Sequence, residues 1–431
     1  MRSSHSLDRV DVVFDDDHQV ANAGLILPAT LAQHLGIKEL ADETIKLGPV
    51  PGAALPGRKV MTVVHGILAG ADSIDDLDVL RAGATQKVLG HVVMAPSTIG
   101  TFLRAFTFGH VRQLDRLTEL VLARAWAAGA GPGDAPMTID IDSTINGVHG
   151  KQKQGASYGY TKQLGYHPLL ATRAETGEVL HVRLRGGRTN TGRGAPRFID
   201  ELVGRVRRAG ATGQLTLRAD SGFWSKKVIK ACRKHGVRYS ITVRNTKPIK
   251  KAIAGIADDV WVRIPYPESG IAEVAEVAHD GARLIVRRVR NLDDQGQLFP
   301  DWRYHAFITD REGPTLELEA DHRNHAVIEL AIRDLKEGAG WNHCPSGRFH
   351  ANAAWLVIAS LAHNLLRWIG RIALAAPGPV VAKTLRFRYL SLPGRMTRSA
   401  RRETLHLPEN WPWRTQFSAA LDRLRAGPAA A

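Results

Sequence analysis

The stretch Met137-Thr-Ile-Asp-Ile-Asp142 decides the fold of this chain. Its Met and Ile side chains alternate with Thr138, Asp140 and Asp142, so apolar residues lie on one face of an extended segment and polar residues on the other. Such alternation predicts a β-strand with one buried face. The strand ends in an aspartate, which places a carboxylate at the edge of the sheet.

Downstream of this strand the sequence alternates between strand and helix patterns. The expected elements are strands at 167–174 and 179–185, a helix from 196 to 209, a strand at 215–220, a basic helix at 225–235 and a strand at 238–244. An antiparallel meander that continues into parallel strands joined by helices is a ribonuclease-H-like α/β arrangement with a mixed sheet. In that arrangement the strands that end at Asp142 and Asp220 lie side by side and parallel.

Changes in pattern divide the chain into five expected parts. They are a mainly helical N-terminal domain (1–130), the first part of a catalytic core (135–245), a β-rich insertion (246–315), the second part of the core (316–372) and a basic C-terminal segment (373–431). The N-terminal helices suit either a helix-turn-helix unit that binds DNA or a plain helical bundle that packs on the core. Later helices are expected at 321–337 and 349–372, and the alternation in Leu385-Arg-Phe-Arg-Tyr-Leu390 indicates a basic β-ribbon.

The net charge points to a polyanionic partner. The chain has 58 Lys and Arg residues against 42 Asp and Glu residues, which gives a net charge of +16 and a pI near 10.1. Residues 1–46 hold eight acids and four bases, so the positive excess lies beyond that segment. Nucleic acid is the commonest polyanion for such a surface. A generally basic proteome or an association with ribosomes is the alternative.

Other features exclude several classes of protein. Two cysteines, Cys232 and Cys344, cannot build a disulfide framework or a four-cysteine zinc site, and the cluster of His343, Cys344 and His350 lacks the usual zinc-ligand spacing. The sequence has no signal pattern, and its longest apolar stretch, 351–366, is interrupted by polar residues and too short to span a bilayer. We expect a cytoplasmic, nucleoid-associated protein with no membrane partner.

Three acidic residues carry the expected chemistry. Asp142 and Asp220 end neighbouring strands, and Glu329 lies on the late helix that completes the core. In-line cutting and joining of DNA uses two divalent ions about 3.5–4 Å apart, and carboxylates supply the hard oxygen ligands that suit Mg²⁺, for which Mn²⁺ can substitute. Each acid also has a structural alternative, as a turn cap or a helix-surface ion pair. Asp140 shares the face of Asp142 and is an alternative metal ligand.

Four runs of residues carry a resemblance to a known family. They are Asp140-Ile-Asp-Ser-Thr144, His149-Gly-Lys-Gln-Lys-Gln154, Arg218-Ala-Asp-Ser-Gly-Phe-Trp224 and Pro345-Ser-Gly-Arg-Phe-His-Ala-Asn-Ala-Ala-Trp355. With these runs the chain resembles bacterial transposases of insertion-sequence family 1380 over nearly its whole length. The resemblance implies an Asp-Asp-Glu enzyme with a ribonuclease-H-like core and a β insertion before the glutamate. It implies Asp142, Asp220 and Glu329 as the metal-binding catalytic triad.

Related transposases share a signature around the glutamate: Tyr, two residues, Arg, three residues, Glu, six residues, Lys. Glu329 and Lys336 keep its spacing, which puts both on one helix face. His322 and His325 occupy the Tyr and Arg positions. Lys336 is the best single candidate for a phosphate contact, and Arg323 is positioned to reach the same backbone.

Further DNA contacts are expected in the insertion and near the C-terminus. Trp302 lies upstream of the glutamate helix, where a tryptophan stacks on a flipped base in some similar transposases; packing within a strand is its alternative. Trp224 is expected to pack beneath the site. Residues 386–402 include six arginines and no acid, and a ribbon there would present them to DNA. The arginines assigned to this contact are Arg395, Arg398, Arg401 and Arg402.

These features predict cut-and-paste DNA transposition, with double-stranded transposon ends and target DNA as substrates. A homodimer on paired ends is expected, because both ends must be joined in concert. A ribonuclease-H-like nuclease that cannot transfer strands and a DNA-binding repressor with a silent core are the alternatives. Strand-transfer products separate a transposase from the first, and loss of activity in EDTA separates it from the second.

Overall fold

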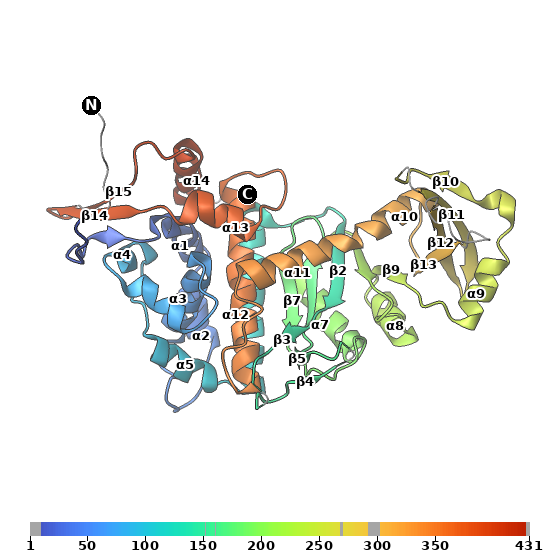
Figure 1. Ribbon diagram of the computed structural model, residues 1–431, viewed down its shortest axis with the longest axis horizontal. Helices are drawn as coiled ribbons and strands as arrows, with labels where there is room; N and C mark the ends of the chain where they lie inside the picture. The colour runs from blue at the N-terminus through green and yellow to red at the C-terminus, as the bar shows by residue number, and fades with distance from the viewer. Residues whose placement is uncertain (1–9, 151, 160, 268–269, 292–301, 428–431) are drawn as a thin grey trace.

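A nine-stranded mixed sheet occupies the centre and right-hand end of the molecule in Figure 1. The computed structural model describes residues 10–150, 152–159, 161–267, 270–291 and 302–427. In order across the sheet, the strands are β10 (Val262–Ile264), β11 (Gly270–His279), β12 (Ala282–Asn291), β13 (Arg303–Thr309), β9 (Arg238–Thr242), β8 (Leu215–Ala219), β2 (Met137–Ser143), β6 (Leu169–Arg173) and β7 (Val179–Arg183). The protein is therefore a mixed α/β protein.

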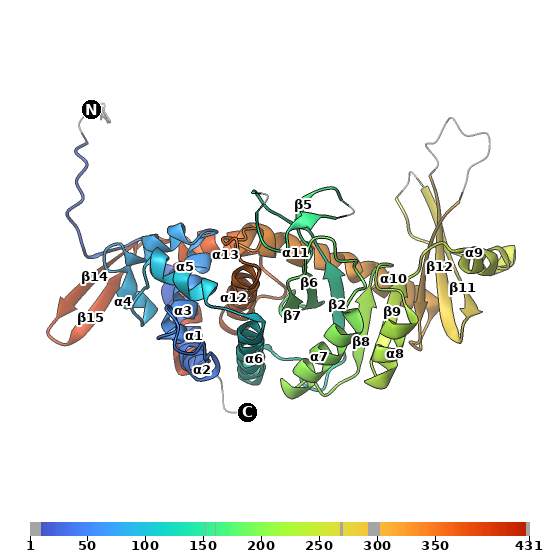
Figure 2. The ribbon, with the colours of Figure 1, turned by 90° about the horizontal axis from the view of Figure 1, so that it is seen from below.

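The half of the sheet from β9 to β7 follows the predicted pairing. β2 pairs in parallel with β8 and antiparallel with β6, while β8 pairs in parallel with β9 and β6 antiparallel with β7. The prediction that the two aspartate-bearing strands lie side by side and parallel is confirmed, with Ile141 opposite Ala219. Helices α7 (Ala195–Arg208) and α8 (Lys226–Lys234) connect these strands and lie below the sheet in Figure 2.

A small second sheet follows β2. It consists of β3 (Asn146–Gly147), β5 (Leu164–Tyr166) and β4 (Ser157–Tyr158). Because Ser143 at the end of β2 pairs with Leu169 at the start of β6, this small sheet lies at the same edge as the predicted carboxylates. The sequence does not predict these short strands.

The β-rich insertion extends the main sheet. β13 pairs with β9, and β12, β11 and β10 continue outward as antiparallel neighbours. The four strands β10 to β13 all lie within the β-rich part that the sequence predicts at 246–315. Helix α9 (Lys247–Ala254) is not predicted by the sequence; Ile249 and Ile253, four residues apart, give it one buried face.

The single helix predicted around Glu329 is two helices, and the first of them begins earlier than predicted. The sequence predicts one helix over 321–337, whereas the structure has α10 (Thr315–Arg323), a 3-10 turn and α11 (Val327–Gly338) in succession. Leu318 is the one buried apolar residue of α10, so this helix lacks the apolar stripe that identifies a helix in sequence. α10 contacts β11 and β12, and α11 contacts β2, so the two helices span the sheet from the insertion to the core (Figure 1).

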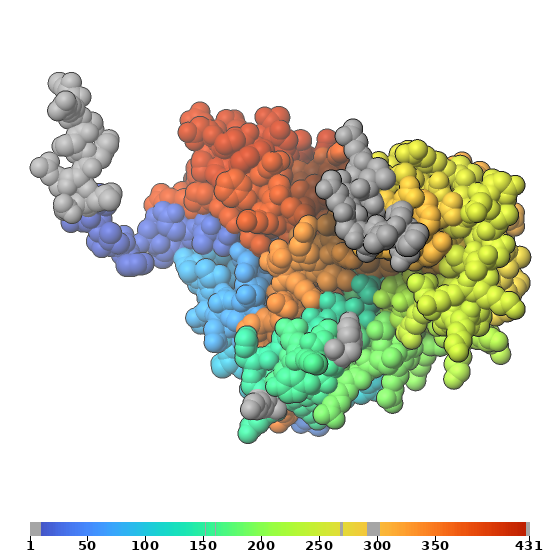
Figure 3. All heavy atoms as spheres, turned by 45° about the vertical axis from the view of Figure 1, so that its right-hand side comes forward, coloured from blue at the N-terminus to red at the C-terminus, as the bar shows by residue number. Residues whose placement is uncertain are grey.

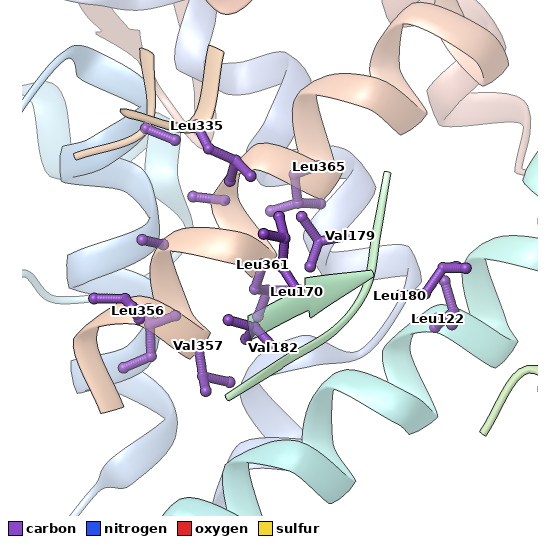
Figure 4. Close-up of a cluster of buried hydrophobic side chains, with 14 of the residues drawn as sticks. Leu122, Leu170, Val179, Leu180, Val182, Leu335, Leu356, Val357, Leu361 and Leu365 are labelled. Atoms are coloured by element: carbon purple, nitrogen blue, oxygen red, sulfur yellow. The ribbon is translucent and has the colours of Figure 1, made fainter. Parts of the chain in front are cut away.

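Helix α12 (Phe349–Trp368) is at the centre of the hydrophobic core. Every residue from 351 to 368 is buried, as expected of a helix that is apolar on most faces. Leu361 and Leu365 lie against Leu170 and Val182 of the sheet (Figure 4). Among the described helices, none is long and apolar enough to cross a membrane.

The N-terminal helices pack on α12. They are α1 (Ile26–His34), α2 (Ile37–Thr44), α3 (Pro56–Ala69), α4 (Thr85–Leu89), α5 (Pro96–Arg104) and α6 (Phe108–Ala125). α3, α5 and α6 contact α12 directly, and their buried residues belong to the same core cluster as those of the sheet. This packing agrees with the helical-bundle alternative. DNA binding by residues 1–130 stays a prediction, as do the five domain boundaries.

The β-ribbon predicted around Arg386 is wrong. The stretch forms α13 (Ala382–Leu385) and a π-helical turn (Arg386–Leu390). Leu385 and Tyr389, four residues apart, are buried, and Phe387 between them is exposed. Burial at a spacing of four residues is typical of a helix, and over so short a stretch it cannot be told from the alternation of a strand. The guanidinium of Arg386 donates to backbone carbonyls of α3 and α11, so this arginine is a structural one.

A basic ribbon is present further along the chain. β14 (Gly394–Ser399) and β15 (Arg402–His406) pair antiparallel, with β1 (Gln19–Val20) on the other side of β14, and project at the left-hand end of Figure 1. Helix α14 (Arg414–Ala426) follows. The four arginines predicted to contact DNA are all exposed on the ribbon and its turn: Arg395, Arg398, Arg401 and Arg402.

A buried carboxylate joins the N-terminal helices, α12 and the sheet. Glu178, which is 1% exposed, accepts hydrogen bonds from the indole nitrogens of Trp126 (3.1 Å) and Trp368 (2.7 Å). Arg173 lies 3.5 Å away and is its charge partner. Buried charges are stabilised only when they are paired and hydrogen-bonded, so this cluster should be sensitive to the loss of the acid.

We expect Glu178→Ala to lower the free energy of unfolding by about 3–5 kcal/mol, because the buried Arg173 loses its partner. Glu175→Ala is the matched control, since Glu175 also pairs with Arg173 but its side chain is 47% exposed, and its loss should cost less than about 1 kcal/mol. Urea unfolding of both variants measures the difference. Equal losses would contradict the assignment of Glu178 as the structural partner.

Candidate active site

Three elements bring the predicted acids to one cavity. Asp142 is next to last in β2, Asp220 directly follows β8, and Glu329 lies in the first turn of α11. Because β2 and β8 are parallel neighbours in register, the two aspartates reach the same edge of the sheet. All three side chains line a cavity of about 340 Å³. Figure 3 shows the α10–α11 segment, in orange, on this face of the molecule between the red C-terminal part and the green strands and loops.

The turn after β8 requires glycine. Asp220 Oδ1 accepts a hydrogen bond from the backbone N–H of Gly222 (2.9 Å). A Cβ atom at position 222 would lie 2.6 Å from the Thr191 side chain and 3.1 Å from Asp220 Oδ1. The Asp-Ser-Gly run of the sequence therefore positions the Asp220 carboxylate.

The three carboxylates repel one another. Burial, reinforced by the negative charges of Asp220 and Glu329, raises the pKa of Asp142 to about 6. A hydrogen bond from the Ser143 N–H and the nearby His325 act in the opposite direction without cancelling it. A site that holds uncompensated negative charge in this way favours a bound cation.

Asp140 is paired within the protein, although it shares a face with Asp142. It is fully buried, and both of its oxygens accept from the guanidinium of Arg218, at 2.7 and 2.9 Å. His325 Nδ1 lies 2.9 Å from the same carboxylate. Of the two aspartates on this strand, Asp142 lines the cavity and Asp140 does not.

His322, at the Tyr position of the signature, is a fixed and neutral wall of the cavity. Its two ring nitrogens lie 2.8 Å from Ser240 Oγ and 3.0 Å from Thr242 Oγ1, and its ring stacks on Phe307 at 4.0 Å. Burial, reinforced by nearby positive groups, lowers the pKa of His322 to about 3.

Two arginines form a positive wall beside the acids. Arg287 of the insertion and Arg323 of α10 line the cavity, and Glu319 lies between them, 3.4 Å from Arg287 Nε and 3.0 Å from Arg323 Nε. Glu319 is 3% exposed. The sequence predicts Arg323 but not Arg287 or Glu319. An arginine in a strand and a glutamate in a helix do not indicate a shared site in the sequence, because they meet only when the insertion packs against α10.

Lys336 and Trp302 have protein partners. Lys336 Nζ donates to Thr144 Oγ1 (2.7 Å) and to the Ile145 carbonyl (2.8 Å), so it fastens the segment that follows β2, and burial lowers its pKa. Trp302 is half-buried, and the guanidinium of Arg288 lies 4.5 Å from its ring centre. A phosphate contact by Lys336 and base stacking by Trp302 stay predictions.

The triad does not form a cage for a single ion. Among the described residues, the group of acidic and histidine side chains whose ligand atoms lie within 4.8 Å of one another is Asp16, Asp17 and His18. That group is on the surface, near Arg395.

The sequence as a whole matches one described family. The profile of the family Transposase DDE domain group 1 covers residues 3–429. This chain belongs to that family. The protein is therefore a DDE-type transposase, and DDE transposases generally use divalent metal ions.

One solved structure is similar to this transposase over most of its length. It is the piggyBac transposase synaptic complex with hairpin DNA, determined by cryo-electron microscopy. The TM-score is 0.47 and the sequence identity 13%, over 86% of this chain and 80% of that chain. No curated protein matches the sequence.

The different environments of Asp140 and Asp142 lead to opposite effects on stability. We expect Asp140→Asn to lower the free energy of unfolding of the transposase by about 3–5 kcal/mol, because Arg218 stays buried without its full charge partner. Asp142→Asn removes a crowded carboxylate, so stability should not fall. Urea unfolding in EDTA measures both. A stable Asp140→Asn protein beside a destabilised Asp142→Asn protein would reverse the assignment of the two residues.

Proposed function

We propose that this transposase moves DNA by a cut-and-paste reaction in which Asp142, Asp220 and Glu329 hold two divalent ions. The convergence of these three side chains on one cavity carries the proposal. Mg²⁺ is the proposed ion, because the donors are carboxylate oxygens, which suit hard cations; Mn²⁺ can replace it. The raised pKa of Asp142 supports the fit, since two positive ions would offset the repulsion among the carboxylates.

The residues around the triad have separate tasks in this proposal. When bound, the two ions would align the attacking and leaving oxygens and offset charge on the phosphate. Arg287 and Arg323 would bind the backbone phosphates that enter beside the acids. Glu319 holds both arginines in place. Lys336 fixes the segment after β2, which keeps Asp142 at the mouth of the cavity.

The proposed fold of the core is ribonuclease-H-like, with a β insertion before the glutamate helix. The antiparallel β7-β6-β2 meander followed by parallel β8 and β9 supports it, as does the position of Glu329 on a helix after the insertion. The four sequence runs that resemble insertion-sequence family 1380 support membership of that bacterial group. We retain the five parts at 1–130, 135–245, 246–315, 316–372 and 373–431 as the proposed domains.

The proposed substrate is double-stranded DNA at the ends of the transposon and in the target. One strand is cut at each end, and the freed 3′-hydroxyl then attacks DNA without a covalent enzyme intermediate. A homodimer that holds two ends together is proposed, because both ends must be joined in concert. The net charge of +16 supports a nucleic-acid partner, and the proposed location is the nucleoid.

Removal of any triad carboxylate tests the proposal. Asp142→Ala, Asp220→Ala and Glu329→Ala should each abolish cleavage and strand transfer on transposon-end DNA, because a metal ligand is removed, while DNA binding in EDTA stays close to that of wild type. Gel assays with the element's own ends and Mg²⁺ measure both products.

The controls separate metal ligation from general damage. Glu337→Ala removes an exposed acid from the same helix as Glu329, and it should keep wild-type cleavage. Near wild-type activity in any triad variant would remove that residue from the site. Cleavage without joined products in the wild-type protein would favour the nuclease alternative.

The exposed ribbon is the second element that we assign to DNA. Arg395, Arg398, Arg401 and Arg402 together changed to Gln should weaken DNA binding and reduce the salt dependence of the binding constant, by about 0.9 in log–log slope for each phosphate that is no longer neutralised. Titrations by fluorescence anisotropy between about 50 and 200 mM salt measure both quantities.

A matched quadruple variant controls for the loss of charge. Arg371, Lys383, Arg414 and Arg425 are also exposed, and their change to Gln removes the same charge from neighbouring helices. If the two quadruple variants bind equally well, with the same slope, the ribbon has no special contact with DNA.

A further inference from the structure

A second cavity lies on the opposite face of the sheet from the triad. Its volume is about 630 Å³, and it is bounded by α8 and by the tip of the β11–β12 hairpin. Successive residues of β13 face opposite sides of the sheet: Phe307 lines the catalytic cavity and Ile308 this one. α8 and the insertion strands lie next to each other at the right-hand end of Figure 1. We call this cavity the α8 groove.

The α8 groove has a basic wall and an apolar floor. Lys226, Lys230 and Arg233 line it from α8, a helix with five Lys or Arg residues and no acid. All three side chains are exposed, and within the described part of the chain none of them forms an ion pair with an acid. Ile229, Tyr239 and Ile308 contribute to the floor. Asp280, at the hairpin tip, is the single acid in the lining.

The three like charges along one wall repel one another, and an anionic occupant would offset that repulsion. Arg233 also donates to the Tyr239 hydroxyl (3.2 Å). The spacing of the three charges is regular, because positions 226, 230 and 233 lie on one side of α8 and rise by about 6 Å and 4.5 Å along it. A row of charges of this kind matches a chain of phosphates better than it matches a single small anion. The apolar floor suits the flat faces of nucleobases.

The groove is connected to the catalytic edge through one turn. Asp220 lines the catalytic cavity and Trp224, four residues later, lines the α8 groove. The turn between them is held by the Gly222-to-Asp220 hydrogen bond and by the buried side chain of Phe223. The Trp224 ring is half-buried, so a strand that crosses this turn meets an aromatic surface before it meets the three cations.

We propose that the α8 groove binds a single strand of DNA as it leaves the catalytic cavity across the Asp220–Ser225 turn, an inference that rests on the proposed function. A base stacks on Trp224, and the phosphates that follow contact Lys226, Lys230 and Arg233. A cavity of this size encloses a drug-sized ligand, so it admits about one or two unpaired nucleotides and excludes a duplex.

Single-strand binding by the full-length protein tests the assignment. The probe is a fluorescein-labelled oligothymidylate of about 12 nucleotides, within the range that single-strand-binding domains cover. In EDTA, the Lys226→Gln, Lys230→Gln, Arg233→Gln triple variant should bind on the order of 10-fold more weakly than wild type, with a salt slope reduced by about 0.7 for each phosphate that is no longer neutralised. Lys227→Gln, Lys250→Gln, Lys251→Gln removes equal charge from exposed positions outside the groove and should bind as wild type does. Equal affinity of the two triple variants overturns the proposal.

A tryptophan variant and a duplex competitor complete the test. Trp224→Leu removes the ring and no charge, so affinity should fall on the order of 10-fold while the salt slope stays unchanged. Undiminished affinity would overturn the proposal, as would a duplex that displaces the probe as well as an unlabelled single strand does. Because binding in EDTA needs no cleavage, failure here leaves the triad result intact, and inactive triad variants leave this result intact.

Discussion

A buried ion pair between adjacent strands sets the geometry on which the site depends. Asp140 of β2 and Arg218 of β8 meet through two hydrogen bonds and are almost fully buried. Removing two charges from water costs several kcal/mol for each ion, and good geometry together with further hydrogen bonds must offset this cost. Arg218 obtains those bonds from the backbone carbonyl (2.5 Å) and carboxylate (3.1 Å) of Asp321. The pair therefore joins the two strands to α10 as well as to each other.

The same pair fixes the position of the third acid. In the turn between α10 and α11, His325 Nδ1 donates to the Asp140 carboxylate, and Arg218 donates to the Asn324 carbonyl. With this turn held on the strands, the first turn of α11 places Glu329 above the sheet edge where Asp142 and Asp220 lie. β13 leads into α10 through a short segment, so the insertion brings Arg287 to the same cavity. The three acids repel one another at the cavity. The Asp140–Arg218 pair, which holds the two strands and the turn together, does not line that cavity.

A sequence pattern predicts a helix or strand correctly when the apolar side chains of that element bury one of its faces. The prediction fails when segments far away in the sequence decide which side chains are buried. The alternation of β2 and the long apolar helix α12 are strong signals because their own side chains form the core. Leu385–Leu390 alternates for a few residues and is helical, since α11 and α12 pack on α13, which ends at Leu385, and α3 packs on the turn that contains Tyr389. α10 has one apolar anchor, so its start is invisible without the insertion strands on which it packs. Asp142 and Asp220 are recognisable in the sequence because they stand at strand ends. Arg287 and Glu319 pair only when the insertion packs against α10, so the sequence has no signal for them.

Two aspartates on one strand face show how the carboxylate that we propose as a metal ligand differs physically from one that is paired within the protein. Asp140 and Asp142 have the same pattern in the sequence, and local propensity cannot separate them. The difference comes from a residue 78 positions away from Asp140 in the chain, Arg218, whose guanidinium compensates one carboxylate completely. Asp142 is left with two neighbouring acids and a raised pKa. Folded proteins rarely leave a buried charge without a partner unless a ligand supplies one. Of the two aspartates, Asp142 is the one without a full charge partner. It lies at the open edge of the sheet, where the proposed cation and phosphate would reach it.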